Sequence, residues 1–376
     1  MTPSDQRYEP SAREPLFILA MDQRSSFAKS LFGLEEDAPE AGLAKMREAK
    51  LVIYEGLHRA AASGLEVGRA GVLVDEHLGS EVARRAKADG LVLAMPIEKS
   101  GTNLFELEYG KDYPEHLAAF EPDFFKVLVR YNPADEAADR TAQIERLVEV
   151  SAWGGKAGWP WLFELLVPPT REQLAQNEDQ FNFDRHARPG LTAETIAAFS
   201  KAGVHPTVWK LEGYETTEGA EEVLQAVAGQ AGGPSECIVL GRNALMEQVE
   251  HWLRVAAPLP GYSGFAVGRS IWMAALQDLL AGRIDRDDAV ATIASRYRTL
   301  VDAYCAARLP GSGSGDSTEP FTWEHARLTP DREARIRRAL AGADMRGTRV
   351  PGWMAATLLA EVDALRAEKG DGTPGA

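Results

Sequence analysis

The chain has 376 residues, of which 45% are hydrophobic and 26% are charged, a composition typical of a folded globular protein. Its formal net charge of −15 opposes binding to nucleic acid or to anionic lipid. Its two cysteines, Cys237 and Cys305, form no CxxC pair, so neither a disulfide framework nor a structural zinc site is expected. The polar N-terminal segment resembles no signal peptide, and no apolar run reaches membrane-spanning length. We therefore expect a cytoplasmic protein with no nucleic-acid or membrane partner.

Short apolar runs alternate with longer amphipathic stretches from residue 16 to about residue 305, a pattern typical of βαβ units and a parallel sheet. The runs predict eight strands, in chain order 16–22, 70–76, 90–97, 124–131, 161–168, 207–213, 237–242 and 264–269. Eight such units favour a closed (β/α)8 TIM barrel. The alternative is an open doubly wound sheet, which needs a glycine fingerprint after its first strand, where this chain has Asp22-Gln23-Arg24-Ser25-Ser26.

The segments outside the barrel differ from it in composition. A Gly-Ser run at 311–315 indicates a linker, and helical patterns at 331–341 and 353–369 indicate a C-terminal helical extension. The predicted organisation is a flexible N-terminal segment at 1–14, the barrel at 15–308, a linker at 309–320, the helical extension at 321–369 and a disordered tail at 370–376.

Polar residues interrupt the predicted strands near their carboxyl ends, where barrel enzymes place their active sites. They are Asp22, Asp75, Glu76, Lys99, Lys126, Arg130, Glu164, Lys210, Glu212, Arg242, Asn243 and Arg269. Strand residues two apart share a face, so Glu164 and Lys210 can enter one layer of the barrel lumen from neighbouring strands. Lys126 lies within reach on the strand before them.

Two lysines and two carboxylates in one lumen are what imine formation requires. A nucleophilic amine must be neutral, and burial and a nearby cation such as Lys126 both favour the neutral form. Lys210 is then the nucleophile, Glu164 the acid for carbinolamine dehydration, and Asp22 the base that starts carbon-carbon cleavage. The alternative is a buried salt-bridge network of Lys126, Glu164 and Lys210 without chemistry.

These residues resemble those of the class I aldolases of the tagatose-1,6-bisphosphate and fructose-bisphosphate type. The string LAMDQRS at 19–25 resembles the strand-one motif that carries the family's catalytic aspartate. The order Lys99, Lys126, Glu164 and Lys210 matches the family's lysine, lysine, glutamate and Schiff-base lysine on strands three to six. The resemblance implies catalysis without a metal or cofactor.

Over about residues 15–310 the chain resembles more closely the aldolase-like domain fused to 5-dehydro-2-deoxygluconokinase in inositol catabolism. The strings that carry this likeness are LFILAMDQR at 16–24, SF at 26–27, LFG at 31–33 and WKLEG at 209–213. The resemblance implies a small-molecule substrate, 2-deoxy-5-keto-gluconate 6-phosphate, cleaved to dihydroxyacetone phosphate and malonate semialdehyde. We also expect a homo-oligomer.

Such a substrate carries a phosphate at one end and a carboxylate at the other. Gly268-Arg269 resembles the family's phosphate site, and Gly241-Arg242 ends the preceding strand. The carboxylate end has three candidates that spacing does not separate: Arg24, Lys99 and Arg130. Gln23 and Ser26 either position substrate hydroxyls or cap the helix after the first strand.

Other functions stay open from the sequence. A metal-dependent aldolase would need several converging histidines, and the seven in this chain are scattered. The Asp75-Glu76-His77 cluster either holds a cation or makes ordinary strand-end hydrogen bonds. The remaining alternatives are an aldolase acting on another ketose (bis)phosphate, another lysine-based reaction such as transaldol transfer, and a non-catalytic barrel that binds a sugar phosphate.

Overall fold

The computed structural model describes residues 14–65, 68–230 and 235–308. The chain divides into two units, Met1–Thr318 and Glu319–Ala376, and every described residue belongs to the first. The predicted linker at 309–320, the helical extension at 321–369 and the tail at 370–376 lie outside the described residues, as do residues 1–13 of the N-terminal segment. Glu14, which the prediction included in that segment, forms an ion pair with Arg69 at 2.9 Å.

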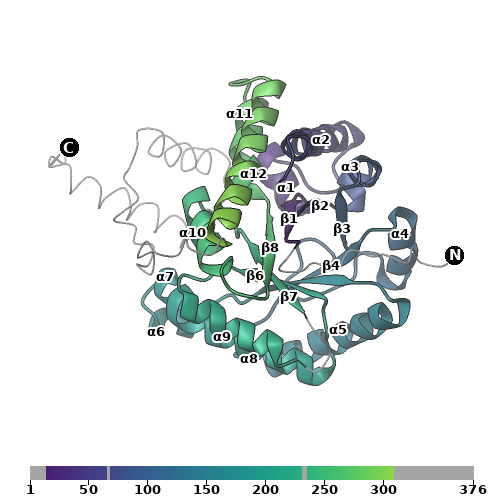
Figure 1. The fold of residues 1–376 in the computed structure, drawn as a ribbon. Coiled ribbons are helices and arrows are strands. Elements are labelled where there is room, and N and C mark those ends of the chain that lie inside the picture. Colours follow the sequence, from purple (N-terminus) through teal and green to yellow (C-terminus); the bar gives the residue numbers. More distant parts are fainter. Residues whose placement is uncertain (1–13, 66–67, 231–234, 309–376) are drawn as a thin grey trace, which may run out of the picture. The chain divides into compact units, whose positions relative to one another are not determined.

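Eight parallel strands close into a barrel in which each strand pairs with its neighbours in the chain and β8 pairs with β1 (Figure 1). The strands are β1 Leu16–Ala20, β2 Arg69–Leu73, β3 Val92–Pro96, β4 Phe124–Arg130, β5 Trp161–Leu166, β6 Val208–Glu212, β7 Glu236–Leu240 and β8 Tyr262–Val267. The predicted (β/α)8 TIM barrel is confirmed. Several strands end before their predicted limits, so polar residues such as Asp22 lie just beyond the paired segment.

Helices surround this sheet and cover its outer face (Figure 1). They are α1 Ser25–Phe27, η1 Ala28–Phe32, α2 Glu40–Ala62, α3 Glu76–Ala88, η2 Gly110–Asp112, α4 Tyr113–Phe120, α5 Ala137–Ala157, α6 Arg171–Gln176, α7 Gln180–Asn182, η3 Phe183–Ala187, α8 Arg188–Ala202, α9 Thr217–Ala228, α10 Met246–Ala256, α11 Arg269–Leu280 and α12 Arg286–Arg308. The last helix of the described residues, α12, packs against α2, α10 and α11, which closes the ring. Within the described part of the chain, no helix is long and apolar enough to cross a membrane.

The barrel interior is apolar at its lower levels and charged above them. Alternate strand residues point inward, and an inner cluster that includes Phe124, Leu162 and Val208 fills the lumen without solvent exposure. On each of these strands, the residue two positions further along points inward and is charged. These residues are Lys126 on β4, Glu164 on β5 and Lys210 on β6. The period-two pattern of the strands therefore places the charged side chains in a layer directly above a dry core.

The seam between β8 and β1 brings two backbones close together at Gly264. Gly264 has φ of +127°, and a Cβ atom there would lie 2.0 Å from the carbonyl oxygen of Leu16. Two aromatic side chains from the last helices also bind β1: the Trp272 indole donates to the Ala20 carbonyl at 2.9 Å, and the Tyr297 hydroxyl donates to the Phe17 carbonyl at 2.7 Å. Helices α11 and α12 are thus fixed to β1 by directional hydrogen bonds.

We expect Gly264→Ala to lower the free energy of unfolding by about 3 kcal/mol or more, because the new methyl group meets backbone atoms at an unfavourable φ. The matched control is Gly155→Ala in α5, where a Cβ atom meets nothing within 4 Å. That change should be neutral or stabilise by up to about 1 kcal/mol, because alanine is the better helix former. Urea unfolding of both variants measures the difference, and equal effects would contradict the close approach at the seam.

Candidate active site

Lys126 lies at the centre of the charged layer and has no solvent exposure. Its ammonium nitrogen lies 2.8 Å from Asp22 Oδ2, 2.6 Å from Glu98 Oε1 and 2.8 Å from Glu164 Oε2. An ammonium group has three N–H donors and no acceptor. Three carboxylates from three parts of the barrel therefore use its whole hydrogen-bonding capacity, and Lys126 has none left for a substrate.

Lys210 differs from Lys126 in its partners. It lies on β6 directly opposite Glu164 of β5 in the strand register, and its nitrogen is 2.8 Å from Glu164 Oε2, the same oxygen that contacts Lys126. This pairing of Glu164 with Lys210 confirms the shared layer that strand alternation predicts. Within the described residues, no second acid lies within ion-pair distance of Lys210. With 3% exposure and one carboxylate partner, Lys210 keeps donors that are not committed.

The electrostatics of the cluster follow from burial and from these contacts. Burial alone would lower the pKa of Lys126, but the surrounding carboxylates outweigh it and raise the pKa, so this ammonium stays charged. Burial would raise the pKa values of Asp22 and Glu164, but Lys126 and Lys210 outweigh it, and both carboxyl groups titrate below their ordinary range. For Glu98 burial prevails over the attraction of Lys126, and its pKa is raised.

Glu98 is part of this cluster although the sequence analysis selected its neighbour Lys99. The Glu98 side chain is 7% exposed and contacts Lys126, whereas Lys99 is exposed and its backbone N–H donates to the Glu106 carbonyl at 2.8 Å. The signal that identifies Glu98 is alternation, because it continues the inward-facing series Val92, Ala94 and Pro96 of β3. The structure therefore brings an acid, and not a lysine, from this strand to the cluster.

Arg24 is buried and already paired. It is 4% exposed, and its guanidinium donates to Glu108 Oε2 at 3.0 Å and to the Glu98 carbonyl at 2.6 Å. Arg24 is also the residue that precedes α1, and neither Gln23 nor Ser26 caps that helix. Ser26 is exposed, while the side-chain oxygen of Gln23 is buried with no hydrogen-bond partner in the described residues. Arg24 thus braces the segment that carries Glu98.

Arg242 belongs to a second charged network beyond the ends of β6 and β7. It pairs with Asp184 of η3 and lies 2.9 Å from Glu212 Oε1. Arg188 completes the network at 3.1 Å from Asp184 and 3.7 Å from Glu212. Arg242 has a φ of +44°, a left-handed backbone conformation that costs free energy for any residue other than glycine. Its ion pairs with these carboxylates hold it there. The network stabilises the loop after β7, and Arg242 is engaged within it.

Arg269 is placed differently from Arg242. It is the first residue of α11, follows Gly268, and makes no ion pair with any residue that the structure describes. Gly268 is required there because a Cβ atom would lie 2.3 Å from the Ala20 carbonyl oxygen. No side chain caps the first turn of α11; the Ile271 N–H donates to the Gly268 carbonyl at 2.8 Å, and the two N–H groups before it lie at the open helix end. A guanidinium beside an uncapped helix N-terminus can bind an anion.

Arg130 is the predicted substrate-binding cation whose charge acts on Arg269. Burial lowers the pKa of the Arg269 guanidinium, Glu164 and Asp22 oppose that fall, and the charge of Arg130 adds to it, so Arg269 lies within electrostatic range of the cluster and of Arg130. Arg130 ends β4 on the face that carries Lys126, is exposed, and makes a long contact of 3.4 Å with the Thr102 carbonyl. Two positive groups therefore lie near one another above the cluster.

The Asp75-Glu76-His77 residues contact separate partners. Asp75 caps α3 by accepting from the Leu78 N–H, and it also pairs with Lys50, a fully buried lysine of α2 that the sequence analysis missed. The two other residues contact His116 and the Glu36 carbonyl, respectively. In the described chain, no group of three or more His, Cys, Asp or Glu side chains is arranged to hold a metal ion.

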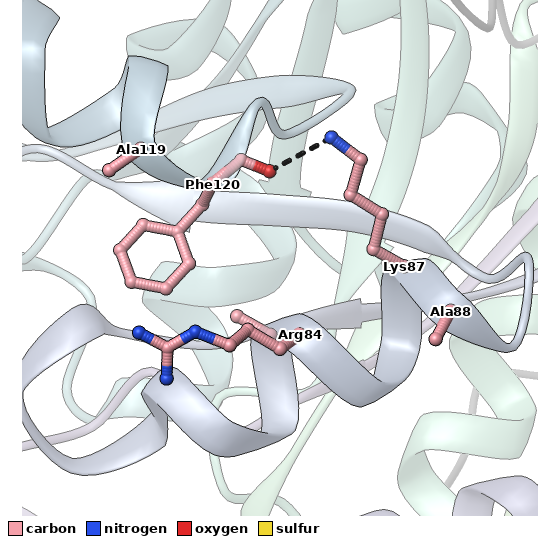
Figure 2. A pocket seen from close by; sticks show the side chains of 6 residues that line it. Arg84, Lys87, Ala88, Ala119 and Phe120 are labelled. Carbon is pink, nitrogen blue, oxygen red and sulfur yellow. Dashed lines mark hydrogen bonds between the residues drawn. The ribbon is translucent and has the colours of Figure 1, made fainter.

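A surface hollow of about 340 Å³ lies between α3 and α4, on the outside of the barrel (Figure 2). The Arg84 guanidinium lies 5.3 Å from the centre of the Phe120 ring, and Lys87 donates to the Phe120 carbonyl at 3.2 Å. Ala83, Ala88 and Ala119 complete the lining. None of these residues belongs to the charged cluster around Lys126, so the hollow is separate from the candidate active site.

Comparisons with known proteins place the chain in a family without assigning a reaction. The profile of a family described as uncharacterized protein conserved in bacteria (DUF2090) matches residues 6–308. A search of curated proteins finds no match. Among solved structures, the chain is similar to Cgl0159 from Corynebacterium glutamicum, with 17% sequence identity, a TM-score of 0.47, and coverage of 77% of this chain and 85% of that chain. A likeness of that degree carries no argument about function.

The two arginines after β7 and β8 should respond differently to substitution. Arg242→Met leaves Asp184 and Glu212 without their closest cation, and we expect a loss of about 2 to 3 kcal/mol in the free energy of unfolding. Arg269→Met should change stability by less than about 1 kcal/mol, because no ion pair within the described chain is lost. Chemical denaturation of both variants tests this, and a larger loss for Arg269→Met would show that Arg269 has a structural role.

Proposed function

The chain belongs to the family described as uncharacterized protein conserved in bacteria, and for this member we propose the activity of a class I aldolase with Lys210 as the Schiff-base nucleophile. The observation that carries the proposal is the contrast between the two buried lysines. Lys126 is saturated by three carboxylates, while Lys210 contacts Glu164 alone among the described acids. A (β/α)8 barrel with such a cluster at the carboxyl ends of its strands is suited to imine chemistry.

The first chemical step would be attack of the Lys210 amine on a substrate carbonyl. Lys210 must lose a proton to become nucleophilic, and Glu164 Oε2 at 2.8 Å is the acceptor within reach. After the attack, a second proton moves from the nitrogen to the carbonyl oxygen and completes the carbinolamine. Glu164 can then return the first proton to that hydroxyl, which leaves as water and gives the protonated imine. Lys126 stays charged beside Glu164, and the two are held 2.8 Å apart throughout this step.

A substrate with an anion at one end fits the positive groups above the cluster. The phosphate would bind Arg269 and the first turn of α11, which lacks a side-chain cap. Of the residues predicted for the carboxylate end, Arg130 and Lys99 are exposed, whereas Arg24 is committed to Glu108. Together with the resemblance to the aldolase-like domain of inositol catabolism, this favours cleavage of 2-deoxy-5-keto-gluconate 6-phosphate to dihydroxyacetone phosphate and malonate semialdehyde.

Reductive trapping tests the nucleophile. We expect borohydride added with the keto sugar acid phosphate to modify Lys210, because an imine is reduced to a stable secondary amine. Lys210→Met should abolish both labelling and cleavage while the fold is retained, since methionine keeps much of the apolar stem. Peptide mass mapping locates the adduct. Trials with dihydroxyacetone phosphate and ketohexose bisphosphates rank the alternative substrates.

The matched control is Lys201→Met, which removes an exposed lysine from the end of α8. It should label and cleave as the unmodified protein does. An adduct on Lys126 or Lys99 would show that the assignment of Lys210 as the nucleophile is wrong. The absence of an adduct with every keto-phosphate tried would favour a non-catalytic binding protein. Labelling without cleavage products would instead favour another lysine-based reaction.

Arg269→Ala tests the phosphate site. Loss of a charge-assisted contact should raise KM for the phosphorylated substrate by about 10- to 100-fold, while kcat changes less, because the contact is made equally before and during the reaction. Steady-state kinetics with phosphorylated and unphosphorylated keto acid measure the effect. An unchanged KM would place the phosphate elsewhere on the barrel rim.

A further inference from the structure

We propose that Glu98, and not Asp22, takes the hydroxyl proton when the carbon-carbon bond is cleaved. This inference rests on the proposed aldolase activity and names the base for its central step. Glu98 follows β3 on the inward-facing side, and its carboxyl group lies within the cluster at 2.6 Å from Lys126.

The two carboxyl oxygens of Glu98 are used unequally. Oε1 binds Lys126, while Oε2 is buried and has no hydrogen-bond partner among the described residues. A buried polar atom without a partner costs free energy that a ligand can recover by binding to it. The structure thus leaves one unsatisfied carboxyl oxygen beside the lysine cluster, which a substrate hydroxyl would satisfy.

The backbone around Glu98 holds this carboxyl group in place. Glu98 forms an isolated antiparallel bridge with Leu107, and the Glu108 N–H donates to the Ile97 carbonyl at 2.9 Å. Arg24 crosses between the two segments, binding both the Glu98 carbonyl and the Glu108 side chain. Three restraints thus fix Glu98, although it lies beyond the end of its strand. A side chain that acts on a substrate needs a fixed position of this kind.

Asp22 is the weaker base of the two. Lys126 and Lys210 hold the pKa of Asp22 below its ordinary range. A carboxylate with a low pKa is a poor general base, because it has little affinity for the proton that it must accept. Burial raises the pKa of Glu98, although Lys126 and Arg24 oppose the rise and only Asp22 adds to it. These are the charged groups that face Glu98 from β4, from the start of α1 and from the end of β1. Glu98 is therefore closer to the proton affinity that a general base needs near neutral pH.

The step balances within the proposed reaction. The cleaved bond joins the carbon next to the imine carbon to a hydroxyl-bearing carbon. The hydroxyl on that second carbon gives its proton to Glu98 Oε2, and its oxygen forms the carbonyl of the departing aldehyde. The pair of electrons from the broken carbon-carbon bond moves into the Lys210 imine, which becomes an enamine. Asp22 keeps its charge throughout and helps to hold Lys126 in position.

The experiment compares Glu98→Gln with Asp22→Asn using 2-deoxy-5-keto-gluconate 6-phosphate. The amide of Gln keeps an acceptor oxygen for Lys126 but accepts no proton at neutral pH. We expect borohydride labelling of Lys210 within about 3-fold of the unmodified protein, with kcat for cleavage reduced by about 100-fold or more. The fall of kcat/KM toward acid pH should disappear in Glu98→Gln and persist in Asp22→Asn.

Rescue by formate provides a second readout that a merely structural role would not give. In Glu98→Ala, added formate should restore cleavage in proportion to its concentration, and in Asp22→Ala it should not. If Glu98→Gln cleaves within about 10-fold of the unmodified protein, or if formate rescues Asp22→Ala instead, the assignment of Glu98 is wrong. Failure of the unmodified protein to form any Lys210 adduct would contradict the aldolase proposal itself, which separates the two outcomes.

Discussion

The ammonium group of Lys126 joins carboxylates that reach the lumen from three separate parts of the barrel. Asp22 follows β1, Glu98 follows β3 and Glu164 lies within β5, and each would be costly to bury as an unpaired charge. A single cation with three donors compensates all three, which limits where each strand end can lie. The position of Lys210 depends on the same arrangement, because its partner oxygen is shared with Lys126.

The fold was accessible from the sequence because its signals are local and repeated. Eight apolar runs with helical stretches between them specify a barrel, and strand alternation correctly placed Glu164 opposite Lys210. Boundaries were less accurate, since apolar residues such as Met21 continue the pattern beyond Ala20, the last residue of β1. The segments after residue 308 lie outside the described chain, so their predicted linker and helices stay predictions.

The site was accessible only in part, because residue type does not reveal which charges neutralise one another. Strand-end position identified Lys126, Glu164, Lys210 and Asp22, but the preference for cations at an anionic substrate led to Lys99, while alternation on β3 points to Glu98. Arginines present the same difficulty. Arg24 and Arg242 are paired with acids that are distant in sequence, whereas Arg269 is not paired within the described chain, and no spacing rule distinguishes the three. Such pairings arise only when the barrel closes.

The seam between β8 and β1 also determines when the protein can finish folding during synthesis. The first strand leaves the ribosome early, but Gly264, Trp272 and Tyr297, which cover and bind it, are made more than 240 residues later. Until then β1 is an unpaired edge on one side, the kind of strand that joins other chains. A nascent barrel of this type therefore exposes one edge of its first strand until β8, α11 and α12 have been made.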